Sequence, residues 1–293
     1  MTPPRRLVVV GARGFIARTL VPALAMRFPG AELNALSSAE LDLTEAGSYQ
    51  RFAAHLDDET VVVVCAGLTR QHGDDLATFS ANVAIATSIS RALAARPPHR
   101  VIYLSSAAVY GEEVHNLAID ESTPQRATSY YGLAKLASEW LIARACRDNG
   151  RTTCLMVRPP LVYGPAEESP GYGPGGFVSA ALLGQTITLW GDGTELRDFI
   201  YVDDLVEILG RLVQSNATGV LNVATGSSTS FVALLDMVRR LSPAPPRIEA
   251  RPRTKAKVDN VFDTTALMRL FPGLSLALPY EGMAKLVESW SLP

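Results

Sequence analysis

The chain has 293 residues, a formal net charge of −2 and an isoelectric point near 6.1. This length allows one large domain or two modest ones, each able to bury a core. The small net charge gives no electrostatic reason to expect binding to nucleic acid or to an anionic membrane.

The N-terminus shows no targeting or membrane-spanning pattern. Only four apolar residues separate Arg6 from Gly11, which is too short for the core of a signal peptide, and no apolar run reaches the length of a membrane span. The three cysteines, Cys65, Cys146 and Cys154, form no Cys-x-x-Cys motif and no cluster with histidine, so no metal site is expected. Unpaired cysteines of this kind favour a reducing, cytoplasmic location.

Short apolar runs alternate with amphipathic patterns through the first half of the chain. The runs predict buried strands at Leu7–Val10, Glu32–Leu36, Val61–Cys65, Val101–Leu104 and Thr153–Val157. Helical patterns lie between them, near residues 15–28, 45–55, 75–96 and 129–148. Continuous apolar strands separated by such helices are typical of a parallel sheet covered on both faces. The sequence therefore predicts an α/β fold with a doubly wound parallel sheet.

The turn after the first strand is rich in glycine and reads Gly11-Ala12-Arg13-Gly14-Phe15-Ile16-Ala17. Glycines let the backbone approach a pyrophosphate, and a helix N-terminus offers N–H groups and the positive end of its dipole. The spacing Gly-x-x-Gly-x-x-Ala differs from the Gly-x-Gly-x-x-Gly fingerprint. The position of this turn, directly after the first strand, therefore carries the prediction of dinucleotide binding.

Two further segments carry residues suited to proton transfer. Ser105-Ser106-Ala107-Ala108-Val109-Tyr110-Gly111 follows the fourth strand, and Tyr131-Gly132-Leu133-Ala134-Lys135 opens a helix. Tyr131 and Lys135 stand four residues apart, which places them on one helical face. An ammonium group favours the ionised form of a nearby phenol, so Tyr131 is predicted to exchange a proton with a carbinol or carbonyl. A Tyr-x-x-x-Lys pair alone is more often an ordinary helix surface.

Taken together, these segments resemble the extended short-chain dehydrogenase/reductases, in particular the NAD-dependent epimerase/dehydratase family that acts on nucleotide sugars. The resemblance covers nearly the whole chain and is most specific at residues 190–204, while residues 158–165 resemble the crossover into the substrate domain. It implies a dinucleotide-binding Rossmann domain of residues 1–163 and 198–224. A smaller, discontinuous α/β domain of residues 164–197 and 225–293 would bind the nucleotide sugar.

The resemblance also assigns the site residues. It makes Tyr131 the acid/base, gives Lys135 the nicotinamide ribose, and places Ser106 on the reacting oxygen, ahead of the neighbouring Tyr130 and Ser105. The predicted cofactor contacts are Gly11, Arg13, Gly14, Phe15, Ile16, Ser37, Ser38, Asp42, Leu43, Ala66, Gly67, Tyr131 and Lys135. The predicted substrate contacts are Ser106, Arg197 and Arg253, because guanidinium groups form paired hydrogen bonds with a diphosphate. Arg253 is chosen by counting back from Asp263.

The end of the second strand bears on which cofactor is used. NAD-preferring relatives place a carboxylate there for the ribose 2′-hydroxyl, whereas this sequence has Ser37 and Ser38 and no acid where the strand ends. Arg13 lies in the cofactor loop, as in relatives such as GDP-fucose synthase that hold a 2′-phosphate. The second arginine that those relatives usually carry near Ser38 is absent. We expect NADP(H) to be favoured over NAD(H).

The residues after Ser106 restrict the reaction. Sugar dehydratases and decarboxylases of this family carry acids where this chain has Ala107 and Ala108, which take no part in proton transfer. The remaining chemistry is hydride transfer at one carbon, C4 by resemblance. We expect an NAD(P)-dependent reduction of a 4-keto sugar nucleotide, because residues 190–193 resemble deoxysugar ketoreductases. A 4-epimerase with retained NAD is the alternative, and a non-catalytic dinucleotide-binding sensor or scaffold is a third.

Two expectations concern parts of the chain outside these motifs. The Gly/Pro-rich segment Ser169–Gly176 is either a loop that closes over the substrate or an ordinary surface turn. The resemblance implies a homodimer that pairs the helices near 75–96 and 129–148. The apolar residues Ile85, Ile89 and Leu93 suit such an interface, and they suit equally a core that faces the sheet.

Overall fold

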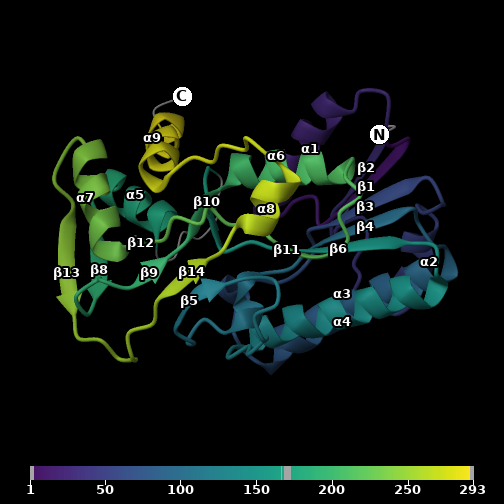
Figure 1. Ribbon diagram of the computed structural model, residues 1–293, viewed down its shortest axis with the longest axis horizontal. Coiled ribbons are helices and arrows are strands. Elements are labelled where there is room, and N and C mark those ends of the chain that lie inside the picture. The colour runs from purple at the N-terminus through teal and green to yellow at the C-terminus, as the bar shows by residue number, and fades with distance from the viewer. Residues whose placement is uncertain (1–2, 166, 168–172, 291–293) are drawn as a thin grey trace. The chain divides into compact units, whose positions relative to one another are not determined.

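The protein is described by a computed structural model that covers residues 3–165, 167 and 173–290. Its α/β architecture confirms the fold class (Figure 1). The strands are β1 (Arg6–Val10), β2 (Glu32–Leu36), β3 (Thr60–Val64), β4 (Arg100–Leu104), β5 (Asn116–Ile119), β6 (Thr153–Arg158), β7 (Leu161–Tyr163), β8 (Thr186–Trp190), β9 (Leu196–Arg197), β10 (Phe199–Tyr201), β11 (Gly219–Asn222), β12 (Thr229–Ser230), β13 (Arg247–Arg251) and β14 (Asn260–Phe262). The helices are α1 (Phe15–Arg27), α2 (Ser48–Ala53), α3 (Leu76–Ala95), α4 (Tyr130–Asn149), α5 (Pro174–Leu182), α6 (Val202–Val213), α7 (Phe231–Leu241), α8 (Thr265–Leu270) and α9 (Pro279–Trp290), with short 3-10 helices η1 (Arg70–His72) and η2 (Ala107–Tyr110).

The chain divides into two compact units. The first comprises residues 1–111, 125–158 and 206–221, and the second comprises residues 112–124, 159–205 and 222–293. These limits differ from the predicted domain limits for two reasons. Strand β5 pairs with β14 of the second unit. Strands β7 and β10 pair with each other, and their side chains Tyr163, Phe199 and Tyr201 pack in the core of the second unit. The assignment of the cofactor to one part and the nucleotide sugar to the other remains a prediction.

The first unit is built on a sheet with the strand order β11-β6-β4-β3-β1-β2. Strands β1 to β4 and β6 pair in parallel. Helices α3 and α4 lie side by side on one face of this sheet, and α1 and α6 lie on the other (Figure 1). Burial of both faces explains why the strands read as continuous apolar runs in the sequence.

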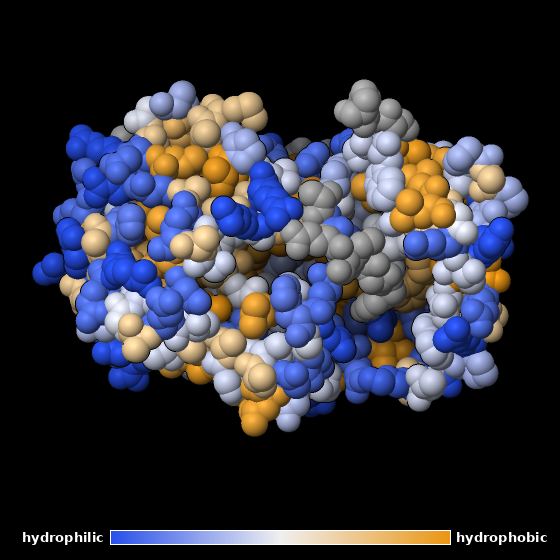
Figure 2. Space-filling view, turned by 180° about the vertical axis from the view of Figure 1, so that it is seen from behind, coloured by the Kyte–Doolittle hydropathy of each residue, from blue (hydrophilic) through white to orange (hydrophobic). Residues whose placement is uncertain are grey.

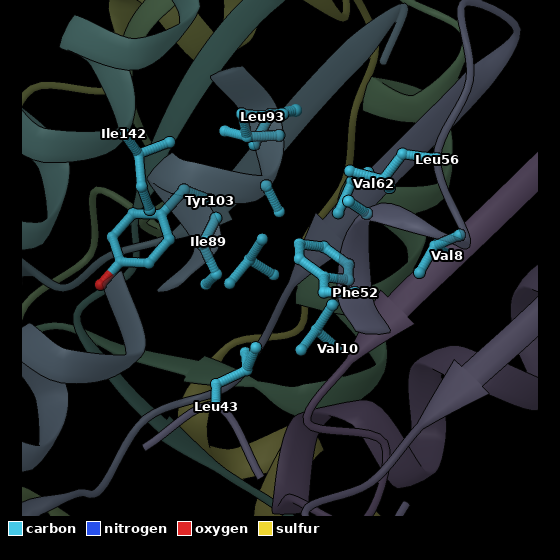
Figure 3. Close-up of a cluster of buried hydrophobic side chains, with 14 of the residues drawn as sticks. Val8, Val10, Leu43, Phe52, Leu56, Val62, Ile89, Leu93, Tyr103 and Ile142 are labelled. Atoms are coloured by element: carbon cyan, nitrogen blue, oxygen red, sulfur yellow. The ribbon is translucent and has the colours of Figure 1, made fainter. Parts of the chain in front are cut away.

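The core under α3 and α4 shows how the helices meet the sheet. Figure 3 shows Ile89 and Leu93 of α3 and Ile142 of α4 pointing toward the apolar side chains of the strands, and all three are fully buried. Of the two roles left open for the apolar face of α3, the structure therefore assigns Ile89 and Leu93 to the core. Removing such side chains typically costs about 2–5 kcal/mol.

The carboxyl ends of the parallel strands meet at one edge of the sheet. In register, Val10 lies opposite Leu36 on one side and Val64 on the other, and Leu104 lies opposite Val157. The chain leaves β1 for β2 on one side and later returns to β3 on the other side of β1. Such a switch point is where open α/β sheets bind ligands.

The second unit consists of small two-stranded sheets packed against helices. Its core joins α5, α7 and α9 through residues such as Phe177, Leu234 and Met283. Tyr163 approaches α9 so closely that a Cβ on Gly282 would lie 2.1 Å from its hydroxyl oxygen, which explains the glycine. Residues 169–172 of the predicted loop Ser169–Gly176 lie outside the described residues, and α5 begins at Pro174.

Hydrophilic residues cover much of the face seen in Figure 2, and hydrophobic residues show between them as separate patches. Scattered apolar residues are normal on a protein surface. In the part of the chain that the structure describes, no helix is both long and apolar enough to span a membrane.

Candidate active site

The glycine-rich turn after β1 is held against the end of β3. Gly11 has a φ of 86°, and a Cβ at this position would lie 2.6 Å from the backbone nitrogen of Ala66. Only glycine fits this approach. The backbone N–H groups of Gly11 and Ala12 donate to the Leu36 carbonyl, at 2.8 and 3.1 Å, which ties the turn to the end of β2 as well.

Helix α1 begins directly beside this turn. Gly14 is its N-cap, and among the described residues no side chain caps the helix and no acid stands in its first turn. The first N–H groups, at Phe15 and Ile16, and the positive dipole end are thereby left to an anion. The predicted contacts Gly11, Gly14, Phe15 and Ile16 are brought together here, and the exposed Arg13 lies in the same turn.

The end of β3 forms the next part of the same edge. Gly67 has a φ of 153°, and a Cβ there would lie 3.2 Å from the Asn82 side-chain oxygen and 3.4 Å from Lys135 Nζ. The Asn82 amide accepts from the Leu68 N–H at 2.8 Å and donates to the Leu68 carbonyl at 3.0 Å, so it joins α3 to this turn. A side chain on Gly67 would crowd the Asn82 amide and the Lys135 ammonium group, and the positive φ is strained for any other residue, which explains the glycine.

An acid lies close to the end of β2, although none was expected there from the sequence. Residues 37–41 form a turn that folds Glu40 back, and its carboxylate accepts from the Ser37 N–H at 2.7 Å and from the Ser37 hydroxyl at 2.6 Å. The Ser37 hydroxyl lowers the pKa of Glu40, and Arg13 lowers it further through space. Glu40 was missed because the turn, rather than the strand itself, brings the acid to this point.

The adjacent predicted contacts, Asp42 and Leu43, follow this turn. Leu43 is buried, and Asp42 accepts from the Thr44 N–H at 2.9 Å and from the Thr44 hydroxyl at 2.7 Å. These bonds lower the pKa of Asp42. The exposed Ser38 lies next to Ser37 in the turn.

Helix α4 begins at the predicted catalytic segment. Ser129 caps it by accepting from the Gly132 N–H at 3.1 Å, and Asp74 accepts from the Tyr131 N–H at 2.9 Å. A carboxylate in this position also complements the helix dipole. Asp74 lies 57 residues before Tyr131, so no local pattern in the sequence indicated this contact.

Lys135 lies one turn along α4 from Tyr131. Its ammonium nitrogen is 5.9 Å from the centre of the Tyr131 ring, and it donates to the Leu104 carbonyl at 2.8 Å. Burial lowers the pKa of Lys135 to about 8, although Glu139 and Cys65 act to raise it. The side chain is therefore mostly charged at neutral pH and supplies a positive charge beside the Tyr131 ring. Tyr130, the rival tyrosine, is 43% exposed and packs against Phe79.

Ser106 and Ser105 are separated by their surroundings. Ser106 is half-buried at the N-cap of η2, where its hydroxyl oxygen accepts from the Ala108 N–H at 3.1 Å. Ser105 is 3% exposed, and its hydroxyl donates to Glu139. The bond to Glu139 engages the Ser105 hydroxyl in the interior, which favours Ser106 as the residue that meets a substrate oxygen.

Gly132 sets the distance between η2 and α4. A Cβ on Gly132 would lie 2.7 Å from the Ala108 carbonyl oxygen, so only glycine permits this approach. The close packing holds the segment that carries Ser106 against the helix that carries Tyr131 and Lys135. In the first unit, a segment that carries a hydroxyl thus packs against a helix that carries a phenol and an ammonium group, residue types that suit proton transfer to or from one oxygen.

The two predicted substrate arginines lie in the second unit. Arg197 ends β9, and its guanidinium donates to the Leu196 carbonyl at 2.9 Å and to the Val258 carbonyl. Arg253 pairs with Asp192, at 2.6 Å, and with Glu195. Its guanidinium packs on Gly191, where a Cβ would approach within 2.8 Å. A diphosphate on Arg253 would compete with these two carboxylates.

Comparisons with known proteins identify relatives that cover most of the chain. A profile of the NAD dependent epimerase/dehydratase family matches residues 7–224. The chain is 29% identical to UDP-glucose 4-epimerase of Mycolicibacterium smegmatis over 313 residues, covering 97% of each chain. It is 28% identical to dTDP-4-dehydro-6-deoxy-D-allose reductase of a Streptomyces species over 279 residues, covering 85% of this chain and 84% of the reductase. The structure of MoeE5 in complex with UDP-glucose and NAD superposes with a TM-score of 0.83 at 25% identity, covering 98% of each chain.

Proposed function

The chain belongs to the NAD dependent epimerase/dehydratase family, and on that premise we propose that it reduces a 4-keto sugar nucleotide to the carbinol. The match of residues 7–224 to the family profile confirms the predicted resemblance. The chain is an NAD(P)-dependent enzyme of the extended short-chain dehydrogenase/reductase type. The nicotinamide, when bound, supplies the hydride. The observation that carries the proposal is that Ser106, Tyr131 and Lys135 are all present, at the N-cap of η2 and on α4. Helix η2 begins with Ala107 and Ala108, at the positions where dehydratases and decarboxylases of the family carry acids.

Each of the three residues has a separate task in the reduction. Ser106 donates a hydrogen bond to the ketone oxygen and orients it toward Tyr131. Tyr131 donates its proton to this oxygen as the carbon becomes a carbinol, and the resulting phenolate is stabilised by the Lys135 ammonium. Because Ala107 and Ala108 carry no ionisable group, this segment supplies no second acid or base of the kind that eliminating water requires.

The test compares two adjacent tyrosines. Tyr131→Phe should retain cofactor affinity and lose about three orders of magnitude in turnover of NADPH with a dTDP-linked 4-keto-6-deoxy sugar, in the range for removal of a general acid. Tyr130→Phe, its exposed neighbour, should remain active. Normal turnover by Tyr131→Phe would refute the catalytic assignment. A wild type that binds a dinucleotide and turns over no sugar would support the sensor or scaffold alternative.

A 4-epimerase is the second candidate, because one relative of nearly equal length bears the name UDP-glucose 4-epimerase. An epimerase retains its nicotinamide through a full cycle, whereas a reductase releases it after each turnover. We expect the purified protein to hold little nicotinamide and to consume one NADPH per ketone reduced. Tightly held NAD together with interconversion of two 4-epimers, without net redox change, would favour the epimerase.

We further propose that NADP(H) is favoured over NAD(H). Arg13, exposed in the glycine-rich turn, supports this because a guanidinium pairs well with a 2′-phosphate. Glu40 at the end of β2 opposes it, because its carboxylate would repel the phosphate and accept from a 2′-hydroxyl. Dissociation constants for both cofactors, in wild type and Arg13→Ala, decide the matter. Tighter binding of NAD by the wild type would refute the preference.

The substrate is proposed to be a nucleotide sugar whose diphosphate contacts Arg197. Arg253 is proposed as a second contact, at which the diphosphate would compete with Asp192 and Glu195. The bonds from Arg197 to two main-chain carbonyls orient its guanidinium before a ligand arrives. The second unit would then bind the nucleotide sugar and the first unit the dinucleotide. A mass-spectrometric screen of UDP-, dTDP- and GDP-sugars against the purified protein would identify the nucleotide.

We also propose that the enzyme is a cytoplasmic homodimer. Helix α4 exposes Leu133, Trp140 and Leu141 on its surface, and Trp140 is 63% exposed, which favours a contact with a second copy. Light scattering should show a dimer for the wild type and a monomer for Trp140→Glu. Trp290→Glu, in the exposed tryptophan of α9, should leave the dimer intact. Cell fractionation would test the location.

A further inference from the structure

A buried ion pair lies beneath the catalytic segment and takes no direct part in the proposed chemistry. Arg158 is 1% exposed and Glu139 is 5% exposed. The Arg158 guanidinium donates from Nε to one Glu139 oxygen at 2.8 Å and from Nη2 to the other at 2.6 Å. Its remaining terminal nitrogen, Nη1, donates to the Tyr110 hydroxyl at 2.9 Å. Each nitrogen of the guanidinium is thereby engaged.

The pair is tied to both ends of the segment that carries Ser106. Ser105, immediately before Ser106, donates its hydroxyl to Glu139, and Tyr110, the last residue of η2, accepts from Arg158. Glu139 itself stands on α4, four residues after Lys135 and eight after Tyr131, on the same helical face. Arg158 ends β6, the strand beside β4. The four side chains thus join η2, α4 and β6 to the residue that directly follows β4.

Burying such an ion pair in a core carries a large desolvation cost. Removing two charges from water costs several kcal/mol for each ion, and apolar residues of similar volume often stabilise a fold as well or better. What the pair adds is direction, because a bidentate guanidinium–carboxylate contact fixes the relative orientation of both groups. Here the groups that it orients lie on either side of Ser106.

We propose that Glu139 and Arg158 are positioning residues that hold Ser106 at a fixed distance and angle from Tyr131 and Lys135. The hydrogen bonds of Ser105 and Tyr110 to this pair hold the segment of residues 105–111 in place. Gly132 permits the close approach of η2 and α4 that this arrangement requires. The inference rests on the proposed catalytic role of Ser106, Tyr131 and Lys135. The anchoring of residues 105–111 can be measured without any substrate.

Glu139 has a second, electrostatic effect on the same site. Burial is the largest influence on the pKa of Lys135 and lowers it, whereas Cys65 and the Glu139 carboxylate raise it. The aromatic rings of Tyr103 and Tyr131 also face the ammonium group, at 5.0 and 5.9 Å from their centres. Loss of the Glu139 charge should therefore move the titration of Lys135 to lower pH, an effect that a purely structural role would not produce.

The experiment uses two mild variants that remove one anchor each. Ser105→Ala deletes the hydroxyl bonded to Glu139, and Tyr110→Phe deletes the acceptor of Arg158 while keeping the ring, 4.9 Å from the guanidinium carbon. Ser48→Ala is the matched control, because Ser48 is also fully buried in the first unit and its hydroxyl donates to Ser88. Hydrogen exchange of the amides of residues 105–111, read by mass spectrometry in the ligand-free protein, reports whether the segment is held.

Both variants should speed exchange in residues 105–111 beyond the change seen in Ser48→Ala. They should lower kcat by about ten- to a hundredfold, the effect of a misplacement of about 1 Å, and change KM by less than about twofold. Exchange in residues 105–111 equal to that of wild type, in both variants, would overturn the inference whatever reaction the enzyme catalyses. Faster exchange with no turnover of 4-keto sugars by the wild type would leave the anchoring supported and refute the proposed function instead.

Glu139→Gln tests the electrostatic effect, provided that the variant folds by circular dichroism. The basic limb of its kcat/KM profile should lie at lower pH than that of wild type. If Glu139→Gln fails to fold, Ser105→Ala and Tyr110→Phe still decide the positioning role, since each leaves the ion pair itself in place.

Discussion

Gly132 offers a sharp test of how the active site is packed. A glycine-to-alanine change within a helix normally stabilises a protein by about 0.5–1 kcal/mol. At Gly132 the new methyl group would instead lie 2.7 Å from the Ala108 carbonyl oxygen and 3.2 Å from the Ala127 side chain. Reaching the 3.4 Å of ordinary contact requires η2 and α4 to separate by 0.7 Å, and the obstacle is backbone, which yields poorly.

The expected magnitude follows from two opposing terms. Overpacking of a fitted interface costs about 1–3 kcal/mol, so after the helical gain we expect Gly132→Ala to lose about 0.5–2 kcal/mol in the free energy of unfolding. A displacement of this size between Ser106 and Tyr131 should lower kcat/KM by about ten- to a hundredfold. Urea denaturation followed by circular dichroism measures the first, and NADPH oxidation measures the second.

The matched control is Gly210→Ala on α6. The nearest atom to its new methyl group would be a carbon of the Arg27 side chain at 3.2 Å, and this flexible chain can move aside. We expect this variant to be as stable as wild type, or more stable by up to about 1 kcal/mol, and fully active. If Gly132→Ala were equally stable and equally active, the close approach of η2 and α4 would not govern the site.

Four other predictions concern charge. Burial lowers the pKa of Lys135 from 10.5 to about 8, so kcat/KM for ketone reduction should fall as the pH rises through about 8; a flat profile would contradict it. Between pH 8 and 10.5 the Lys135 side chain is protonated in the unfolded chain and largely neutral in the folded one. The free energy of unfolding of the wild type, relative to that of Lys135→Met, should therefore rise with pH over this range, as urea titrations would measure. Arg197→Ala should weaken nucleotide-sugar binding by about 1.5–3 kcal/mol, the range for a hydrogen bond to a charged group, and leave NADPH binding unchanged. The exposed Arg240→Ala is the control, and equal losses for both ligands in Arg197→Ala would mean that Arg197 supports the fold instead. Glu40→Gln should shift affinity toward NADP(H) over NAD(H) by about two- to fivefold, as expected for a screened surface charge, and calorimetry with each cofactor would show it.

The sequence alone was sufficient for the scaffold of the first unit. Apolar runs such as Val61–Cys65 predicted strands because a sheet buried on both faces demands unbroken apolar side chains. The helical spacing placed Tyr131 and Lys135 on one face, which the structure confirms, and the position of Gly11 after the first strand predicted a turn that only glycine permits. These features depend on neighbours within a few residues of one another.

Tertiary structure decided what depends on residues far apart in the chain. The pairing of β5 with β14 draws residues 112–124 into the second unit. A turn brings the Glu40 carboxylate to the carboxyl end of β2, where the last residues of the strand carry no acid. The cap that Asp74 forms on Tyr131 spans 57 residues, and the bond from Arg158 to Tyr110 spans 48. No local period encodes such contacts, because the sheet order and helix packing that create them arise only when the whole unit has folded.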